Sequence, residues 1–372
     1  MENTQVLVAK PKIHVEERTS LLDTILKDLV AKGGSDLHMK VGEPPIYRIH
    51  GFLQRSHFPV LNSEETKRIL FSIMKEEQKK RFLENLELDI SYSIPGLARF
   101  RVNVFCQKGN VGAVIRVIPL RIRTIDEWGL PQILKKIALL RRGFVLVTGP
   151  TGSGKSTTLA AMIEHINSHE RRHIITIEDP IEFLHTDKMS TIEQRELGVD
   201  THSFSGALRH VMRQNPDVIL VGEMRDLETI SMAITAAEMG SLVFATLHTT
   251  DAAQTVDRII DVFAPEQQQQ VRLQLSNSLE AIISQTLLPL LKGEGRTAAF
   301  EILICTSGVR NVIREGKTYQ IYSLIQAGQR YGMQLLDLAL KDLYLRGLVS
   351  YGDALSKSSN PQEFEQSVGR MG

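Results

Sequence analysis

Cysteine is scarce in this chain of 372 residues, which contains only Cys106 and Cys305. The two lie far apart in the sequence and neither belongs to a Cys-x-x-Cys pair, so the pattern predicts neither a disulfide framework nor a zinc module. We expect both side chains to fill core space in a protein of the reducing cytosol.

Long apolar runs are absent as well. No stretch of about 18 apolar residues occurs, so no segment is expected to cross a membrane by itself. Residues 1–19 are polar, carry mixed charge and lack the apolar stretch of a secretory signal, so we expect them to form a flexible tail.

An excess of one charge sign is also missing, because 44 Lys and Arg residues face 43 Asp and Glu residues, for a formal net charge of +1. No basic stripe interleaved with aromatic residues occurs either, so no nucleic-acid partner is expected. The hydrophobic content of 42% is that of a globular protein, and the length predicts about two domains.

Residues 20–119 have the pattern of an α+β domain. Apolar residues at helical spacing predict a helix that begins near Ser20, and one further helix is expected over residues 63–86. Residues 120–129 are expected to be a linker that lets two domains rotate. Short apolar stretches bounded by turn residues predict strands at 36–40, 46–49, 88–92, 100–105 and 111–118.

Residues 130–372 begin as an alternation of strands and helices, which predicts an α/β fold. The strands are continuous apolar runs, as expected when helices cover both faces of a parallel sheet. From residue 265 onward the chain is expected to be mostly helical, with one long helix over 267–291. The strands of this domain are predicted at 144–148, 174–177, 218–221 and 242–246.

The most specific motif lies between the first of these strands and a predicted helix. It matches G-x-x-x-x-G-K-[ST], the loop that binds nucleotide phosphates. Its glycines allow backbone N–H groups to point at the phosphates, Lys155 adds a positive charge, and the Ser156 hydroxyl suits Mg²⁺. The predicted nucleotide-binding residues are Gly149, Pro150, Thr151, Gly152, Ser153, Gly154, Lys155, Ser156, Thr157 and Thr158.

Polar side chains follow the other three predicted strands, at the edge of a parallel sheet where ligands collect. Glu178 and Glu182 belong to an acidic cluster after the second strand, which could hold Mg²⁺ through water or could be a solvated turn. Glu223 follows the third strand and is expected to orient or deprotonate the attacking water and to serve as a further water-mediated ligand of Mg²⁺. His248 follows the fourth strand, as a γ-phosphate sensor or as a structural hydrogen-bonding residue.

Together these segments resemble the secretion and type IV pilus ATPases over nearly the whole chain after the tail. The resemblance implies a PAS-like N-terminal domain, then a RecA-like P-loop ATPase domain with a helical C-terminal region. It also implies a catalytic set of Glu223, Glu182 and His248, with ATP and Mg²⁺ as cofactors. The segments similar to family motifs are 35–38 and 42–45 in the N-terminal domain, 177–183 (Asp box), 222–226 (atypical Walker B) and 245–249 (His box).

Two features are similar to the retraction branch of that family. Extension motors usually carry a tetracysteine zinc module, which two distant cysteines cannot build. Residues 308–315 are similar to the AIRNLIRE motif of the retraction branch, although by themselves they could be a short amphipathic helix with two exposed arginines. The matching positions are Arg310, Asn311, Ile313, Arg314 and Glu315, and the departures are Gly308, Val309 and Val312.

The resemblance implies a hexameric ATP-hydrolysing motor that powers type IV pilus retraction and twitching motility. Such a motor is cytoplasmic and acts at the inner face of the cytoplasmic membrane, at the pilus base. Implied partners are a second copy of the chain, an inner-membrane platform protein and an accessory retraction ATPase. Arginines of a neighbouring subunit would complete the site, or could simply be solvated surface; the candidates are Arg101, Arg116, Arg195 and Arg209.

Three alternatives stay open at this point. The chain could be an accessory retraction ATPase or a related secretion or pilus-assembly ATPase. It could be a nucleotide-dependent scaffold that scarcely hydrolyses ATP, although the complete set of acids and histidine argues against this. It could also translocate nucleic acid, which the charge balance disfavours.

Overall fold

The computed structural model describes residues 20–49, 51–119, 121–293 and 295–369, and the expected tail at 1–19 lies outside this part. The chain divides into two compact units, Met1–Pro119 and Leu120–Gly372. Within the described ranges, no helix combines the length and apolar character needed to cross a membrane.

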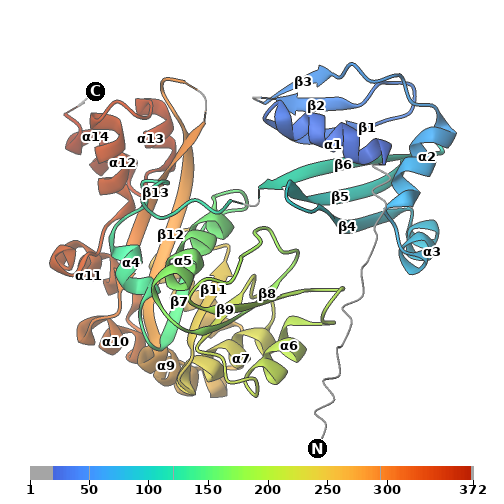
Figure 1. The fold of residues 1–372 in the computed structure, drawn as a ribbon. Helices are drawn as coiled ribbons and strands as arrows, with labels where there is room; N and C mark the ends of the chain where they lie inside the picture. Colours follow the sequence, from blue (N-terminus) through green and yellow to red (C-terminus); the bar gives the residue numbers. More distant parts are fainter. Residues whose placement is uncertain (1–19, 50, 120, 294, 370–372) are drawn as a thin grey trace, which may run out of the picture. The chain divides into compact units, whose positions relative to one another are not determined.

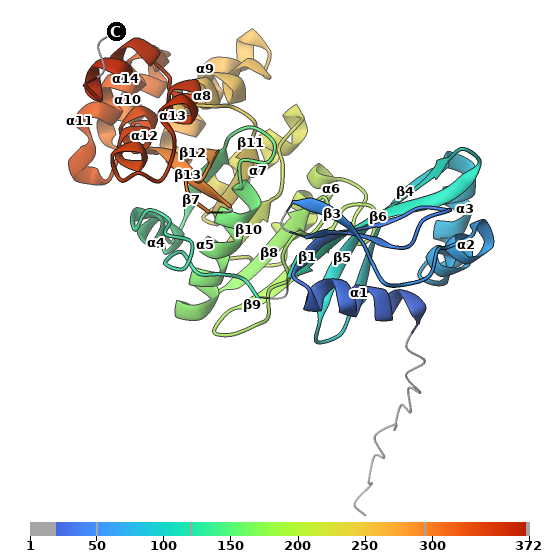
Figure 2. The same cartoon turned by 90° about the horizontal axis from the view of Figure 1, so that it is seen from above.

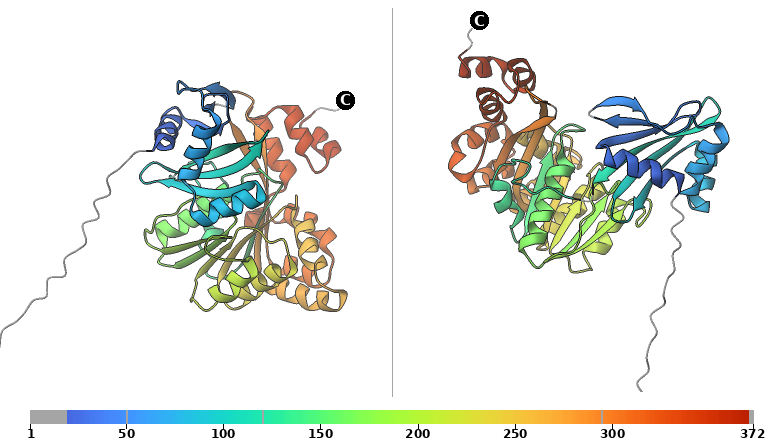
Figure 3. Two further views of the ribbon diagram at one scale, coloured as in Figure 1. Left: turned by 90° about the vertical axis from the view of Figure 1, so that its right-hand side faces the viewer. Right: turned by 45° about the horizontal axis from the view of Figure 1, so that its top comes forward.

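The first unit is an antiparallel sheet of six strands in the order β3-β2-β1-β6-β5-β4. The three helices among its described residues share one apolar core against the sheet, and Figure 3 shows α1 in blue lying across the strands. The strands are β1 (Gly34–Met39), β2 (Ile46–Ile49), β3 (Phe52–Arg55), β4 (Glu87–Ile94), β5 (Ala98–Gln107) and β6 (Asn110–Pro119), and the helices are α1 (Leu21–Ala31), α2 (Ser63–Ser72) and α3 (Glu76–Asn85).

The single helix predicted over 63–86 is wrong, because the chain forms α2 and α3 there. At Lys75 the backbone is extended, with φ −69° and ψ 157°. The Lys75 backbone N–H donates to Gln78 Oε1 at 2.9 Å, which caps the new helix. Strand β3 was not predicted, because all four of its residues are exposed and show no alternation.

The second unit is a seven-stranded sheet in the order β13-β12-β7-β11-β10-β8-β9, parallel except for the β12–β13 pair (Figure 1). The strands are β7 (Gly143–Thr148), β8 (His173–Glu178), β9 (Thr191–Glu196), β10 (Val218–Val221), β11 (Leu242–Leu247), β12 (Leu279–Pro289) and β13 (Arg296–Ile304). The helices up to residue 278 are α4 (Ile133–Ala138), α5 (Lys155–His169), α6 (Phe204–Val211), α7 (Leu227–Glu238), α8 (Ala252–Asp261) and α9 (Pro265–Ser278).

Both faces of this sheet are buried, which explains the continuous apolar strands. On β7, Phe144 and Leu146 belong to a core shared with α6 to α10, whereas Val145 and Val147 belong to a core shared with α4 and α5. Alternate residues of one strand therefore serve two helical layers. The predicted α/β class is confirmed.

The helix predicted over 267–291 is wrong in its second half. Helix α9 ends at Ser278, and β12 then pairs parallel with β7 and antiparallel with β13. The periodicity of a short apolar run does not distinguish a buried strand from a buried helix. Here the segment becomes a strand because it pairs with β7. Figure 2 shows the C-terminal helices gathered together, namely α10 (Ser307–Arg314), α11 (Ile321–Ala327), α12 (Leu336–Leu345), α13 (Tyr351–Lys357) and α14 (Pro361–Ser367).

Much of the expected linker is packed onto the second unit. Ile125 and Leu130 are buried in the same core as α4 and α5, and Leu130 N–H donates to Ile125 O at 2.9 Å. Lys135 Nζ also donates to Asp126 Oδ2 at 2.7 Å. Residues 125–130 therefore form part of the second unit.

Candidate nucleotide and catalytic site

The order of the strands brings the candidate residues to one edge of the sheet. Strand β7 pairs with β11, β11 with β10, and β10 with β8, all in parallel. Their carboxyl ends lead into the phosphate loop, His248, Glu223 and the segment that starts at Glu178. Because parallel strands end at the same edge, the phosphate loop, Glu178, Glu223 and His248 lie at one edge of the sheet.

Glycine is required at two points of the phosphate loop. Gly149 has φ +138°, and a Cβ built there would lie 2.2 Å from the backbone oxygen of Gln285. Gly154 has φ +92° and directly precedes α5. Residues with side chains rarely adopt either conformation, so the loop depends on glycine at both positions.

The ammonium group of Lys155 is held at the mouth of the loop. Its Nζ donates to Gly149 O at 2.8 Å and to Pro150 O at 3.2 Å. Burial lowers the pKa of Lys155, while the charges of Glu223 and Glu182 raise it. Lys155 therefore lies within electrostatic range of both acids.

Two residues of β12 support the loop, and the sequence interpretation missed both. Gln285 Nε2 donates to Ser153 O at 2.7 Å, and the hydroxyls of Ser284 and Thr148 lie 2.8 Å apart. No sequence signal pointed to Ser284 or Gln285, because their segment was interpreted as helix. The β12 strand therefore fixes the loop from its flank.

Glu223 is held by two cationic or polar neighbours. Arg225 Nη2 donates to Glu223 Oε2 at 2.7 Å, and Arg225 Nε lies 2.7 Å from Oε1. His248 Nε2 lies 2.8 Å from the same Oε1. The Arg225 hydrogen bond, and then that of His248, hold the pKa of Glu223 below its usual range. Glu223 is therefore a carboxylate that can accept a hydrogen bond from water.

The two acids of the loop after β8 differ in their surroundings. Glu178 Oε1 accepts from Thr176 Oγ1 at 2.6 Å and from Gln194 Nε2 at 3.1 Å, and burial raises its pKa. Glu182 is exposed. The geometry gives Glu178 a supporting position and leaves Glu182 open to ligand.

The four arginine candidates lie on different elements and each has an acceptor nearby. Arg101 and Arg116 are direct partners across β5 and β6 in the first unit. Arg195 and Arg209 belong to the second unit. The acceptors are Asp89 Oδ1 at 3.8 Å for Arg101 Nε, Asp36 Oδ1 at 2.9 Å for Arg116 Nε, Asp200 O at 3.1 Å for Arg195 Nη2 and Glu228 Oε1 at 2.8 Å for Arg209 Nη2.

Residues 308–314 form most of α10, Glu315 follows as its C-cap, and the segment does not present two equivalent exposed arginines. Arg310 is partly buried, and its Nη1 donates to Ser276 O at 2.9 Å and to Asn277 O at 3.0 Å. Its Nη2 donates to Glu280 Oε1 at 2.8 Å. Arg314 is exposed. Arg310 therefore satisfies carbonyl groups at the end of α9, whereas Arg314 faces outward.

Comparison with known proteins identifies the family of this chain. A family model described as type II/IV secretion system protein matches residues 14–301. The type IV pilus retraction ATPase PilT of Pseudomonas aeruginosa is 51% identical over 333 residues, which cover 90% of this chain and 96% of that protein. The type IV pilus ATPase PilU of the same organism is 42% identical over 341 residues, or 92% and 89% of the two chains.

Solved structures give the same result. A crystal structure of the pilus retraction motor PilT with bound ADP superposes with a TM-score of 0.87 at 46% identity and covers 93% of this chain and 99% of that one. The ATPase DotB of Legionella pneumophila has a TM-score of 0.78 at 29% identity, covering 90% and 93%. With the phosphate loop, Glu223 and His248 at one sheet edge, this chain belongs to the type II/IV secretion system ATPase family.

Proposed function

We propose that this chain is the ATP-hydrolysing subunit of a motor that retracts type IV pili. The carrying observation is the arrangement of the phosphate loop, Glu223 and His248 at adjacent strand ends, in a chain half identical to a retraction ATPase. The direction of movement is supported by the residues that match the retraction motif, namely Arg310, Asn311, Ile313, Arg314 and Glu315.

The phosphate loop binds ATP, and Lys155 leaves the carbonyls of Gly149 and Pro150 for the β- and γ-phosphates, which are stronger acceptors. Hydroxyl and carboxylate oxygens are the donors that Mg²⁺ prefers, and Ser156 supplies the hydroxyl. Glu182 and Glu223 would supply carboxylates that reach the ion through water, and Glu178 would support the segment of Glu182 through its hydrogen bonds to Thr176 and Gln194. Bound Mg²⁺ would neutralise charge on the transferring phosphoryl group.

Glu223 orients the attacking water for in-line displacement. The carboxylate can do so at neutral pH because Arg225 and His248 stabilise its charged form. His248 also senses the γ-phosphate, since its 2.8 Å contact with Glu223 lets a phosphate contact on the ring move the catalytic carboxylate.

The active assembly is a homo-hexameric ring with ATP between neighbouring subunits. Arg101 or Arg116 of one subunit, or Arg195 or Arg209, offsets charge in the site of the next. The domains at 20–119 and 130–372 move relative to each other as ATP is bound and hydrolysed. The ring works on an inner-membrane platform protein at the pilus base, on its cytoplasmic side, together with an accessory retraction ATPase.

A role as the accessory retraction ATPase is the second candidate, because PilU is also 42% identical over most of the chain. A deletion strain separates the two. Loss of the main motor leaves excess unretracted pili and no twitching, and expression of PilT restores movement; loss of an accessory motor is not repaired by PilT.

The site assignment is tested with purified Lys155→Ala and Glu223→Gln. Lys155→Ala is expected to lose ATP binding. Glu223→Gln is expected to bind ATP but to hydrolyse it at least about 100-fold more slowly than the parental protein, measured by phosphate release. Glu238→Gln, on the exposed end of α7, is the matched control and keeps the parental rate. Hydrolysis by Glu223→Gln at the parental rate would place the water-orienting group elsewhere.

A further inference from the structure

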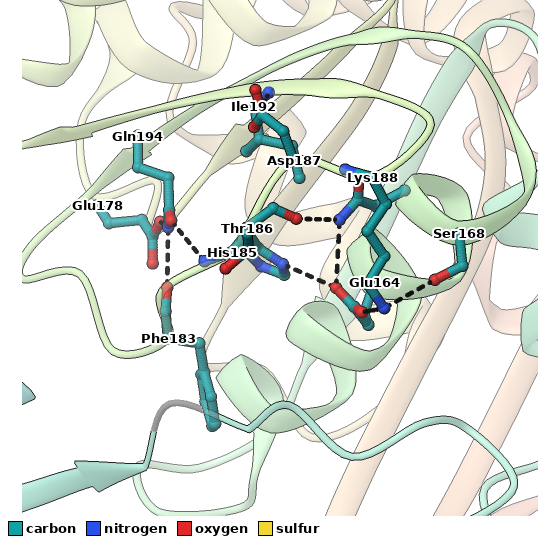
Figure 4. A network of polar contacts seen from close by, with 11 residues as sticks. Glu164, Ser168, Glu178, Phe183, His185, Thr186, Asp187, Lys188, Ile192 and Gln194 are labelled. Carbon is teal, nitrogen blue, oxygen red and sulfur yellow. Dashed lines mark hydrogen bonds and ion pairs between the residues drawn. The ribbon is translucent and has the colours of Figure 1, made fainter. Parts of the chain in front are cut away.

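The loop of residues 179–190 joins β8 to β9 and carries Glu182. None of its residues belongs to a helix or strand. Its backbone polar groups therefore need partners from neighbouring side chains. Side chains of α5 hold the second half of the loop, and side chains of β9 hold the first half (Figure 4).

The second half is held by Asn167, which is fully buried near the end of α5. Its Nδ2 donates to Thr186 O at 2.8 Å, and its Oδ1 accepts from Lys188 N–H at 3.0 Å. An ion pair between Lys188 and Glu164 of α5 adds to this contact (Figure 4). The loop is thereby joined to the helix that begins with Lys155.

The first half is held by Gln194, in the middle of β9. Its Nε2 donates to Phe183 O at 2.8 Å and to Glu178 Oε1 at 3.1 Å, and its Oε1 accepts from His185 N–H at 2.8 Å. These contacts flank Glu182 on both sides in the sequence. One side chain thus connects the end of β8, the segment next to Glu182 and the edge strand.

The contacts require a carboxamide. Two acceptors, Phe183 O and Glu178 Oε1, face its nitrogen, and one donor, His185 N–H, faces its oxygen. A carboxylate offers no donor, so a glutamate side chain would leave Phe183 O without this hydrogen bond and Glu178 Oε1 with Thr176 Oγ1 alone. An aliphatic side chain would lose all three hydrogen bonds.

We propose that Gln194 is a positioning residue for ATP hydrolysis. It fixes the backbone that directly follows Glu182 and the side chain of Glu178 before it, and so places Glu182 against the nucleotide. The proposal depends on the role given above to Glu182. Among the hydrogen bonds of the described residues, Gln194 contacts neither the phosphate loop nor Glu223. It therefore acts on catalysis through the loop at 179–190 and does not change the affinity for nucleotide.

The test compares Gln194→Glu and Gln194→Leu with the parental protein as the full-length chain. Both are expected to bind a fluorescent ADP analogue within about 3-fold of the parental affinity, with the KM for ATP similarly little changed. The kcat is expected to fall about 10-fold or more, because a catalytic group misplaced by an ångström costs a large rate factor. Gln270→Glu, an exposed glutamine on α9, is the matched charge control and keeps the parental kcat.

A double-mutant cycle with Glu182→Gln identifies the route of the effect. If Gln194 acts through Glu182, adding Gln194→Leu to Glu182→Gln lowers kcat by less than about 2-fold, because the two changes remove the same contribution. Additive losses would overturn this. So would a lowered melting temperature with unchanged kcat, or failure of both Gln194 variants to bind ADP, since positioning leaves the phosphate loop intact.

The same cycle separates this proposal from the assignment of Glu182. If Glu182→Gln alone keeps the parental kcat, the assignment of Glu182 is wrong. A lower kcat of Gln194→Leu would then come from another group of the loop at 179–190, and the proposal that Gln194 acts through Glu182 would be rejected. This conclusion would not depend on the results for Lys155→Ala and Glu223→Gln.

Discussion

Gly149 illustrates how tightly the phosphate loop is fixed at the level of one residue. Gly149→Ala would place a methyl group 2.2 Å from Gln285 O in a conformation that side chains rarely adopt. We expect it to abolish ADP binding, measured with a fluorescent analogue. Gly152→Ala is the control: its φ is also positive, at +77°, but its Cβ meets nothing within 4 Å. In that variant the left-handed conformation at position 152 costs about 1–2 kcal/mol, and measurable ADP binding is expected to remain.

Glu301 on β13 is a buried acid outside the catalytic set. Its Oε1 accepts from Ala252 N–H, the first residue of α8, at 2.8 Å, and burial raises its pKa from 4.5 to about 7. The folded protein therefore binds this proton more tightly than the unfolded chain. Its contribution to stability is fully present below pH 4.5 and is lost as the pH rises through about 7.

Replacement by Gln removes this titration. Relative to the parental protein, Glu301→Gln is expected to gain about 2 to 3 kcal/mol in free energy of unfolding between pH 5 and pH 8. Urea unfolding at the two pH values measures the change. Glu238→Gln, at an exposed site, is the matched control. Parallel pH curves for Glu301→Gln and the parental protein would mean that Glu301 titrates normally in the fold.

At the scale of elements, α10 has one arginine that supports the fold and one that faces outward. Arg310→Ala removes hydrogen bonds to Ser276 O, Asn277 O and Glu280, and should cost about 1–3 kcal/mol of unfolding free energy. Arg314→Ala, at an exposed position, should change it by less than about 0.5 kcal/mol. Thermal or urea unfolding of the two variants measures the difference.

The same pair tests the motif in cells. If residues 308–315 contact a partner, Arg314→Ala impairs pilus retraction while the protein stays fully folded. Normal twitching by the Arg314→Ala strain would restrict the motif to its structural role, which Arg310 carries.

At the scale of the whole molecule, an active site built from two subunits should regain activity when two inactive variants, each lacking a different part of the site, are assembled together. Lys155→Ala subunits cannot bind ATP productively but keep Arg101, and Arg101→Ala subunits keep the phosphate loop. If Arg101 acts in a neighbouring site, each variant alone is nearly inactive, and co-assembled mixtures regain part of the parental phosphate release. Mixtures no more active than the sum of their parts would remove Arg101 from the list of trans residues. Arg116 can be tested in the same way, although its loss also breaks the 2.9 Å contact with buried Asp36.

The elements that the sequence predicted well have strong local patterns. The strands before the phosphate loop, Glu223 and His248 are continuous apolar runs, and they form β7, β10 and β11 near the predicted bounds. The errors fall where local pattern is ambiguous. Residues 279–289 could be a buried helix or a buried strand, and only the free edge of β7 makes them β12.

The sequence by itself determined the chemistry of this protein, because the phosphate loop, the acids and the histidine are each defined by a few consecutive residues after an apolar strand. The tertiary structure decided which groups hold that chemistry in place. Gln285 lies 132 residues from the Ser153 carbonyl that it binds, and His248 reaches Glu223 from the end of the neighbouring strand, 25 residues further along the chain. Such partners depend on the order of strands in the sheet, and strand order is set by the packing of the whole domain and not by any local pattern.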